Sequence, residues 1–104
     1  MSYRCHTLDG VVDIDWQHGQ QHMWESHGLT PQEANEAVND PDAAWFIPDY
    51  ASRSGKSIRV IGYSRTAARI LTVILVDDPT CPLDYFGSNA WTANDKDTNA
   101  YLND

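Results

Sequence analysis

The side chains of this chain best suited to binding phosphate are concentrated in one short segment. The sequence has 104 residues, with 15 acidic and 7 basic side chains and a formal net charge of −8. Five of the seven basic residues nevertheless lie between residues 53 and 69, where there is no Asp or Glu. Arginine offers several fixed hydrogen-bond donors to phosphate or carboxylate oxygens. We therefore expect the segment to be the working surface, and its cations are Arg53, Lys56, Arg59, Arg65 and Arg69.

His27 is the candidate for proton transfer, because an imidazole changes its charge near physiological pH. It closes a helical period that starts at Trp16, and Gly28 after it suits the left-handed conformation just beyond a helix. At that place an imidazolium also gains from the helix dipole, which is a purely structural role. Both roles are open from the sequence.

A metal site would need more ligands than the sequence places together. His18 and His22 are spaced i, i+4, but no third ligand stands beside them and there is no H-E-x-x-H pattern. We expect both to be solvated helix residues, and we expect no metal and no cofactor. A metal-dependent hydrolase would require carboxylates clustered around these two histidines.

Two strands are expected to carry the arginines. Residues 57–63 and 69–76 are rich in β-branched and aromatic residues, and residues 64–68 separate them. The second run is apolar on both faces, as in a strand with something packed on each side. If the first strand is regular, Arg59 and Tyr63 share a face, which would place a cation and a phenol together and bring Arg69 near the phenol.

The rest of the chain predicts an α+β domain. Thr30, Pro31 and Glu33 form a capping box with proline in the first turn, which starts a helix that ends before Pro41. The expected order is two N-terminal helices, a three- to four-stranded antiparallel sheet and a C-terminal helix. The other expected elements are strands over 11–14, 43–47 and 85–90, helices over 16–27 and 94–102, and a loop over 77–82 whose two prolines exclude an inner strand.

Composition restricts the class of protein. The length suits one domain, residues 1–104, and no apolar run reaches the length of a membrane span. The N-terminus lacks the apolar core of a signal peptide, so we expect a cytoplasmic protein with no membrane contact. Cys5 and Cys81 are expected to be reduced. A sequence pI near 4.6 disfavours indiscriminate nucleic-acid binding and leaves room for a local basic patch.

Short motifs along residues 12–102 resemble the BrnT-like toxin family. The motifs that resemble the front half of that family are Trp16, His22, His27-Gly28, the run 30–34 and Asp40-Pro41. The runs 59–62 and 69–71 resemble its central hairpin. The run 90–93 and Tyr101 resemble its terminal strand and helix.

The resemblance implies a single BrnT-like domain of the RelE type, a small ribonuclease toxin that acts without metal. A cognate antitoxin, usually with a DNA-binding domain and encoded beside the toxin, would neutralise it. His27, Arg59 and Arg69 would face the RNA-cutting site. Such cleavage needs proton transfer, which histidine can supply, and charge stabilisation at the phosphate, which arginine can supply. The expected RNA-binding residues are Arg53, Lys56, Tyr63, Arg65 and Trp91.

The chain also departs from the family pattern. The stretch 89–93, where the family usually carries basic residues, has no charge, and the first helix has no Lys or Arg. This leaves a second hypothesis, in which a catalytically weak or inactive BrnT-like domain acts as a protein-binding module. Its acidic surface would then attract a basic partner, and Trp91 and Tyr101 would anchor the interface.

Overall fold

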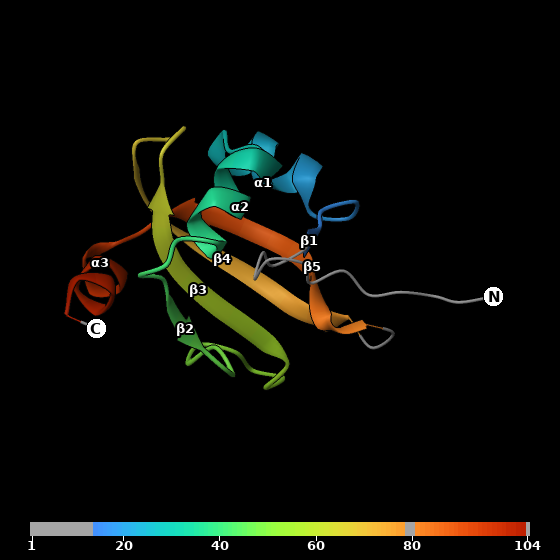
Figure 1. Cartoon of the computed structure of the whole chain (residues 1–104). Coiled ribbons are helices and arrows are strands. Elements are labelled where there is room, and N and C mark those ends of the chain that lie inside the picture. The colour runs from blue at the N-terminus through green and yellow to red at the C-terminus, as the bar shows by residue number, and fades with distance from the viewer. Residues whose placement is uncertain (1–13, 79–80, 104) are drawn as a thin grey trace.

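The computed structural model of the chain describes residues 14–78 and 81–103. Its elements are, in order, β1 (Ile14–Asp15), α1 (Gln20–His27), α2 (Pro31–Val38), β2 (Ala44–Phe46), β3 (Ser57–Ser64), β4 (Arg69–Asp78), β5 (Cys81–Thr92) and α3 (Asp95–Leu102) (Figure 1). The strands form one sheet in the order β1-β5-β4-β3-β2. β1 runs parallel to β5, and the other neighbours are antiparallel. The described part of the chain therefore has an α+β fold, with three helices and a mixed five-stranded sheet.

The sheet has more strands than the three or four antiparallel strands predicted from the sequence. The additional strand is β1, whose Ile14 and Asp15 pair in parallel with Tyr85 and Phe86 of β5. Two residues have no hydrophobic period of their own, so this strand depends on a partner far along the chain. Residues 11–13 of the expected first strand, and Cys5, lie outside the described residues.

The prediction of a loop over 77–82 was wrong at both ends of that range, which belong to β4 and β5. β5 begins at Cys81, and Pro82 is part of it. The register between β4 and β5 shifts between Asp77 and Asp78. A proline is tolerated at such a bulge, because the ladder there does not need its missing N–H. Pro79 lies outside the described residues.

The main core lies between one face of the sheet and helices α1 and α2, which lie side by side over that face (Figure 1). Alternate residues of β3 and β4 enter it, as the two-residue period of a strand requires. The fully buried members with the largest side chains are Met23, Leu29, Val60, Leu71, Val73 and Leu75. Thr72 and Ile74 on the other face of β4 are also buried, which confirms the prediction that this strand is covered on both faces.

Local signals at the helix ends mostly hold. The side chain of Thr30 accepts a hydrogen bond from the backbone N–H of Glu33, whose carboxylate accepts one from the backbone N–H of Thr30 at 2.9 Å, so the capping box is confirmed. Gly28 ends α1 with a φ of 65°, also as predicted. The predicted start of α1 at residue 16 was wrong. The helix begins at Gln20, and His18 lies in the turn before it. His18 and His22 therefore do not share a helical face.

Candidate functional site

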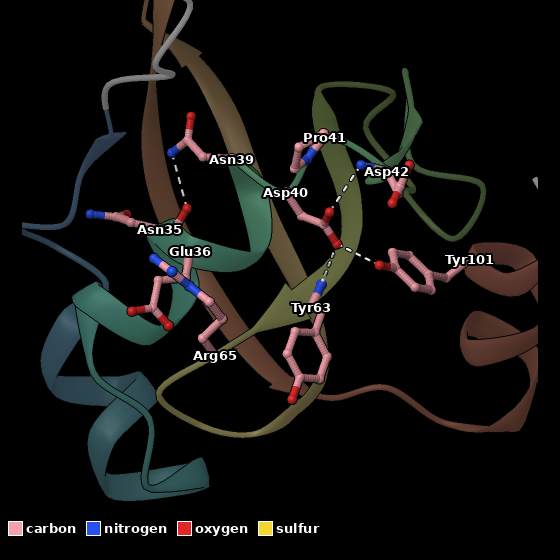
Figure 2. Close-up of a pocket in the computed structure, with 9 residues that line it drawn as sticks. All are labelled: Asn35, Glu36, Asn39, Asp40, Pro41, Asp42, Tyr63, Arg65 and Tyr101. Carbon is pink, nitrogen blue, oxygen red and sulfur yellow. Dashed lines mark hydrogen bonds between the residues drawn. The ribbon is translucent and has the colours of Figure 1, made fainter.

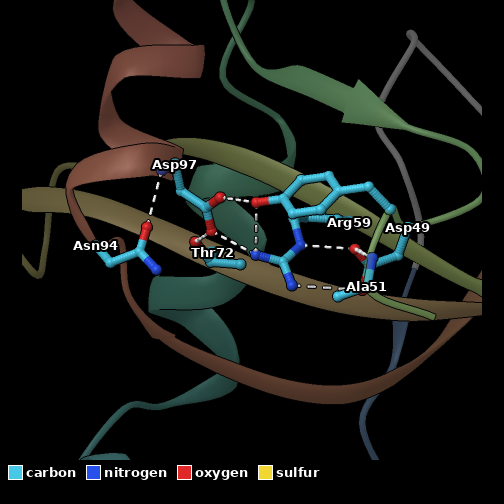
Figure 3. A network of polar contacts seen from close by, with 7 residues as sticks. Asp49, Ala51, Arg59, Thr72, Asn94 and Asp97 are labelled. Carbon is cyan, nitrogen blue, oxygen red and sulfur yellow. Dashed lines mark hydrogen bonds and ion pairs between the residues drawn. The ribbon is translucent and has the colours of Figure 1, made fainter. Parts of the chain in front are cut away.

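Arg59 lies at the centre of a polar cluster on the sheet face opposite the main core (Figure 3). We call Arg59, Asp49, Tyr50, Thr72 and Asp97 the Arg59 cluster. Arg59 and Thr72 come from β3 and β4, and the alternation of side chains puts both on the face away from α1 and α2. Asp97 reaches them from α3, and the other two come from the connection between β2 and β3.

Two carboxylates hold the guanidinium of Arg59. Its Nε donates to Oδ1 of Asp49 at 2.8 Å, and its Nη1 donates to Oδ2 of Asp97 at 2.5 Å. The hydroxyl of Thr72 donates to the same oxygen of Asp97 at 2.7 Å, and the hydroxyl of Tyr50 donates to the other oxygen. Asp97 is fully buried and Arg59 is 7% exposed. The protein itself therefore balances the charge of Arg59.

The pKa values in the cluster follow from this pairing. Burial raises the pKa of Asp97, but hydrogen bonds from Tyr50 and Thr72 and the charge of Arg59 outweigh it, so the pKa lies below its ordinary value. Burial lowers the pKa of Arg59, but the two carboxylates raise it above its ordinary value. Burial and the bond to Asp97 raise the pKa of Tyr50 to about 12. At neutral pH, Arg59 and Asp97 stay ionised and Tyr50 stays protonated.

Trp91 connects the Arg59 cluster with His27. The guanidinium carbon of Arg59 lies 5.7 Å from the centre of the Trp91 ring, within reach of a cation–π contact. The rings of Trp91 and His27 have centroids 5.9 Å apart at an angle of 49°. His27 is exposed at the end of α1. The structure thus places two of the three predicted catalytic residues against the same tryptophan.

Arg69 and Tyr63 lie toward the end of the hairpin that carries the β3–β4 turn. Arg69 is exposed and pairs with Ser64, while Tyr63 pairs with Ile70. The ring of Tyr63 is 42% exposed. The phenol beside the guanidinium is therefore Tyr50, whose ring centre lies 4.5 Å from the guanidinium carbon.

The other predicted RNA-binding cations are on the surface. Arg53 and Lys56 are exposed in the connection before β3, and Arg65 is exposed in the turn after it. In the part of the chain that the structure describes, the two ion pairs both belong to Arg59. The exposed cations are thus accessible to an anion. Arg59 is not accessible, because it is buried and paired with two carboxylates.

Sequence reasoning missed the acidic half of the Arg59 cluster. Asp97 stands in the first turn of α3, four residues before Tyr101 and so on the same helix face. Thr72 is the one polar residue in the apolar run 70–76, which signals a buried partner. Asp49 stands in a polar connection and carries no such signal.

A second candidate site is a cavity of about 680 Å³ between α2, the end of β3 and α3 (Figure 2). We call it the Asp40 cavity. Its charged and aromatic lining consists of Glu36, Asp40, Asp42, Tyr63, Arg65 and Tyr101.

Asp40 ties the walls of this cavity together. Its Oδ2 accepts hydrogen bonds from the backbone N–H of Tyr63 at 2.8 Å and from the hydroxyl of Tyr101 at 2.6 Å. Its Oδ1 accepts from the backbone N–H of Asp42 at 2.9 Å. Partial burial raises the pKa of Asp40, but these bonds outweigh it and the pKa lies below its ordinary value. The hydrogen bond that Tyr101 donates to Asp40 raises the pKa of the Tyr101 hydroxyl to about 12. At neutral pH the cavity therefore holds an ionised Asp40.

Glu36 is the second fixed anion of the cavity. Its Oε1 accepts from the backbone N–H of Thr66 at 2.8 Å and from the hydroxyl of Ser64 at 2.9 Å, and its Oε2 accepts from the hydroxyl of Thr66 at 2.7 Å. The hydrogen bond from the backbone N–H of Thr66 lowers the pKa of Glu36 most. Together with the bonds from the hydroxyls of Thr66 and Ser64, it brings this pKa to about 2. Glu36 therefore anchors the β3–β4 turn to α2 as a carboxylate.

This pairing predicts a loss of stability in acid. A carboxylate with a pKa of about 2 in the fold and about 4.5 when unfolded stabilises the fold above pH 4.5, and the stabilisation is lost as pH falls toward 2. We expect Glu36→Gln to be less stable than the parent at pH 6 and to lose less stability on acidification. Urea unfolding followed by tryptophan fluorescence at several pH values measures both effects. Glu25→Gln, exposed on α1, is the matched control, and equal pH slopes in the parent and Glu36→Gln would contradict the prediction.

The described residues contain neither a group of metal ligands nor a helix that could span a membrane. Across residues 14–78 and 81–103, no three His, Cys, Asp or Glu side chains are grouped so that they could hold a metal ion. His18 and His22 are both exposed. Among the helices described, none combines the length and the apolar character needed to cross a membrane.

Comparison with known proteins gives no family. No protein-family model matches the sequence, and no curated protein matches it. The function proposed below therefore rests on the Arg59 cluster, the charge of the surface and the resemblance of the sequence motifs to the BrnT-like family.

Proposed function

We propose that this chain is a BrnT-like domain that binds a partner protein and does not cut RNA. One observation carries the proposal: the guanidinium of Arg59, expected to neutralise a phosphate, is held by Asp49 and Asp97 in a buried cluster. The resemblance to the toxin half of a toxin–antitoxin pair supplies the kind of partner, which is a protein encoded beside this one.

The energies favour the internal pairing of Arg59 over phosphate binding. To reach a phosphate, Arg59 would have to leave two buried carboxylates, and breaking a buried ion pair costs about 3–5 kcal/mol. A hydrogen bond to a charged group returns about 1.5–3 kcal/mol. A single phosphate contact therefore does not offset the loss, and Arg59 remains with Asp49 and Asp97.

The surface favours a basic protein partner over a nucleic acid. A net charge of −8 repels a phosphate backbone and attracts a positively charged surface. Large apolar side chains are also available to anchor an interface, since Trp24 is 60% exposed and Ile47 is 66% exposed. Of the two anchors predicted from the sequence, Trp91 is half-buried, and the hydroxyl of Tyr101 is bound to Asp40.

Co-expression with the product of the adjacent gene tests the proposal. We expect the two proteins to co-elute in size-exclusion chromatography at physiological ionic strength. We also expect the complex to weaken as salt is raised, because salt screens the attraction between opposite charges. Separate elution of the two folded proteins at every salt concentration would contradict the proposal.

A ribonuclease is the second candidate, and the shared contact of His27 and Arg59 with Trp91 favours it. In this reading Trp91 stacks on a base, His27 transfers a proton, and the exposed Arg69 binds the phosphate in place of the buried Arg59. The purified protein would then produce RNA fragments that the His27→Ala variant does not produce.

A further inference from the structure

We propose that the Asp40 cavity binds an arginine side chain presented by the partner protein. The inference rests on the partner-binding role proposed above and names the chemistry of the group that the partner must supply. It involves none of the residues of the Arg59 cluster.

The charge of the cavity lining selects a cation. Glu36, Asp40 and Asp42 contribute three carboxylates against the single cation Arg65. The hydrogen bonds that hold Glu36 and Asp40 keep both ionised at neutral pH. Asp42 is exposed at the same cavity. It bonds to Asp40 through its backbone N–H, and this contact does not involve its carboxylate. The lining thus carries an excess of negative charge that a ligand can balance.

The shape and the aromatic rings select a long side chain with a planar cation. The volume of about 680 Å³ lies within the range of about 300–1,000 Å³ that is typical of ligand sites. Tyr63 and Tyr101 each contribute an aromatic ring to the wall, and Pro41 adds apolar surface. A guanidinium stacks on such rings and bonds to carboxylates with several donors, while its aliphatic stem packs on apolar surface. Arginine meets all three requirements.

Three elements far apart in the sequence meet at this cavity. Asn35 and Glu36 belong to α2, Tyr63 to β3 and Tyr101 to α3, and the carboxylate of Asp40 lies between β3 and α3 (Figure 2). Hydrogen bonds within the chain, from the backbone N–H of Tyr63 and the hydroxyl of Tyr101 to Asp40, hold the walls in place. A preformed site loses less conformational entropy when its ligand binds.

An NMR titration with short peptides tests the proposal. The probe is an acetylated and amidated peptide of glycine and serine with one central arginine, added at physiological ionic strength. We expect saturable shifts of the backbone amide signals of Asn39, Asp42, Tyr63 and Tyr101. The same peptide with citrulline in place of arginine keeps the shape and loses the charge, and we expect it to shift these signals at least tenfold less at equal concentration.

Two variants separate binding in the cavity from attraction to an acidic protein. Asp42→Asn combined with Tyr63→Leu removes one carboxylate and one ring, and leaves the backbone N–H of residue 63 free to bond to Asp40. We expect it to bind the arginine peptide about tenfold or more weakly. Glu25→Gln changes the net charge by the same amount on exposed α1 and is expected to bind like the parent.

Failure of this inference can be told apart from failure of the proposed function. Equal affinity of the double variant and Glu25→Gln, or equal shifts with the citrulline peptide, would overturn the arginine site. If the parent still co-elutes with the product of the adjacent gene, the partner-binding role stands and only the cavity assignment is lost. If the peptide binds in the cavity and no complex forms with that product, the partner assigned under the proposed function is wrong.

Discussion

Arg59→Met is expected to lower the free energy of unfolding by about 3–5 kcal/mol, because it leaves two buried carboxylates without their cation. Asp97 is fully buried and Asp49 is 7% exposed, so water cannot replace the guanidinium without opening the structure. A loss of this size is about a fifth or more of the 5–15 kcal/mol that stabilises a typical domain. Urea unfolding followed by tryptophan fluorescence measures the change.

Matched variants show whether burial of the charge is the cause. Arg69→Met removes an exposed cation from the same hairpin and is expected to change stability by less than about 0.5 kcal/mol. Adding Asp97→Leu and Asp49→Leu to Arg59→Met removes the orphaned charges and is expected to recover much of the loss, since apolar replacement of a buried ion pair is often neutral. If Arg59→Met is as stable as Arg69→Met, the Arg59 cluster does not hold the charge as described.

The second large effect is expected at Gly62, where β3 and α2 are in contact. A Cβ atom on Gly62 would lie 1.9 Å from the carbonyl oxygen of Ala37, which is a backbone atom and cannot turn aside. Gly62→Ala therefore has to separate the helix from the sheet. We expect a loss of about 3 kcal/mol, at the upper end for overpacking, in the same urea unfolding experiment.

Gly55→Ala is the control for this substitution. Gly55 has open space where a Cβ would be, and its φ of 74° makes alanine unfavourable by about 1–2 kcal/mol. The two variants thus separate a steric clash from backbone strain. A smaller loss for Gly62→Ala than for Gly55→Ala would show that α2 does not lie against β3 as closely as the structure has it.

The parts of the fold that could be predicted are those with local causes. The capping box from Thr30 to Glu33 and the left-handed Gly28 each depend on a few neighbouring residues, and both are present. The hairpin of β3 and β4 was also predicted, because both segments are rich in β-branched and aromatic residues and a short segment separates them. The parallel pairing of β1 with β5 and the passage of β5 through Pro82 could not be predicted, since each depends on a strand elsewhere in the chain.

The candidate site shows the same division. Charge asymmetry indicated the segment 53–69, but it did not indicate that Arg59 would be balanced from within. Asp49 and Asp97 stand 10 and 38 positions away from it in the sequence. Among the acidic residues whose side chains the structure describes, Asp49 and Asp97 are the buried ones, and no neighbouring motif marks them as partners of Arg59. Only the tertiary structure identifies the partners of Arg59.

The most direct test of the account is total RNA in cells that express this chain. The parent and the variant His27→Ala, Arg69→Ala are induced at equal levels, and growth and RNA integrity are followed. If the chain is a binding module with Arg59 held internally, both proteins leave growth normal and RNA intact. Growth arrest with RNA loss from the parent alone, with both proteins soluble and folded, would contradict the account and establish the ribonuclease.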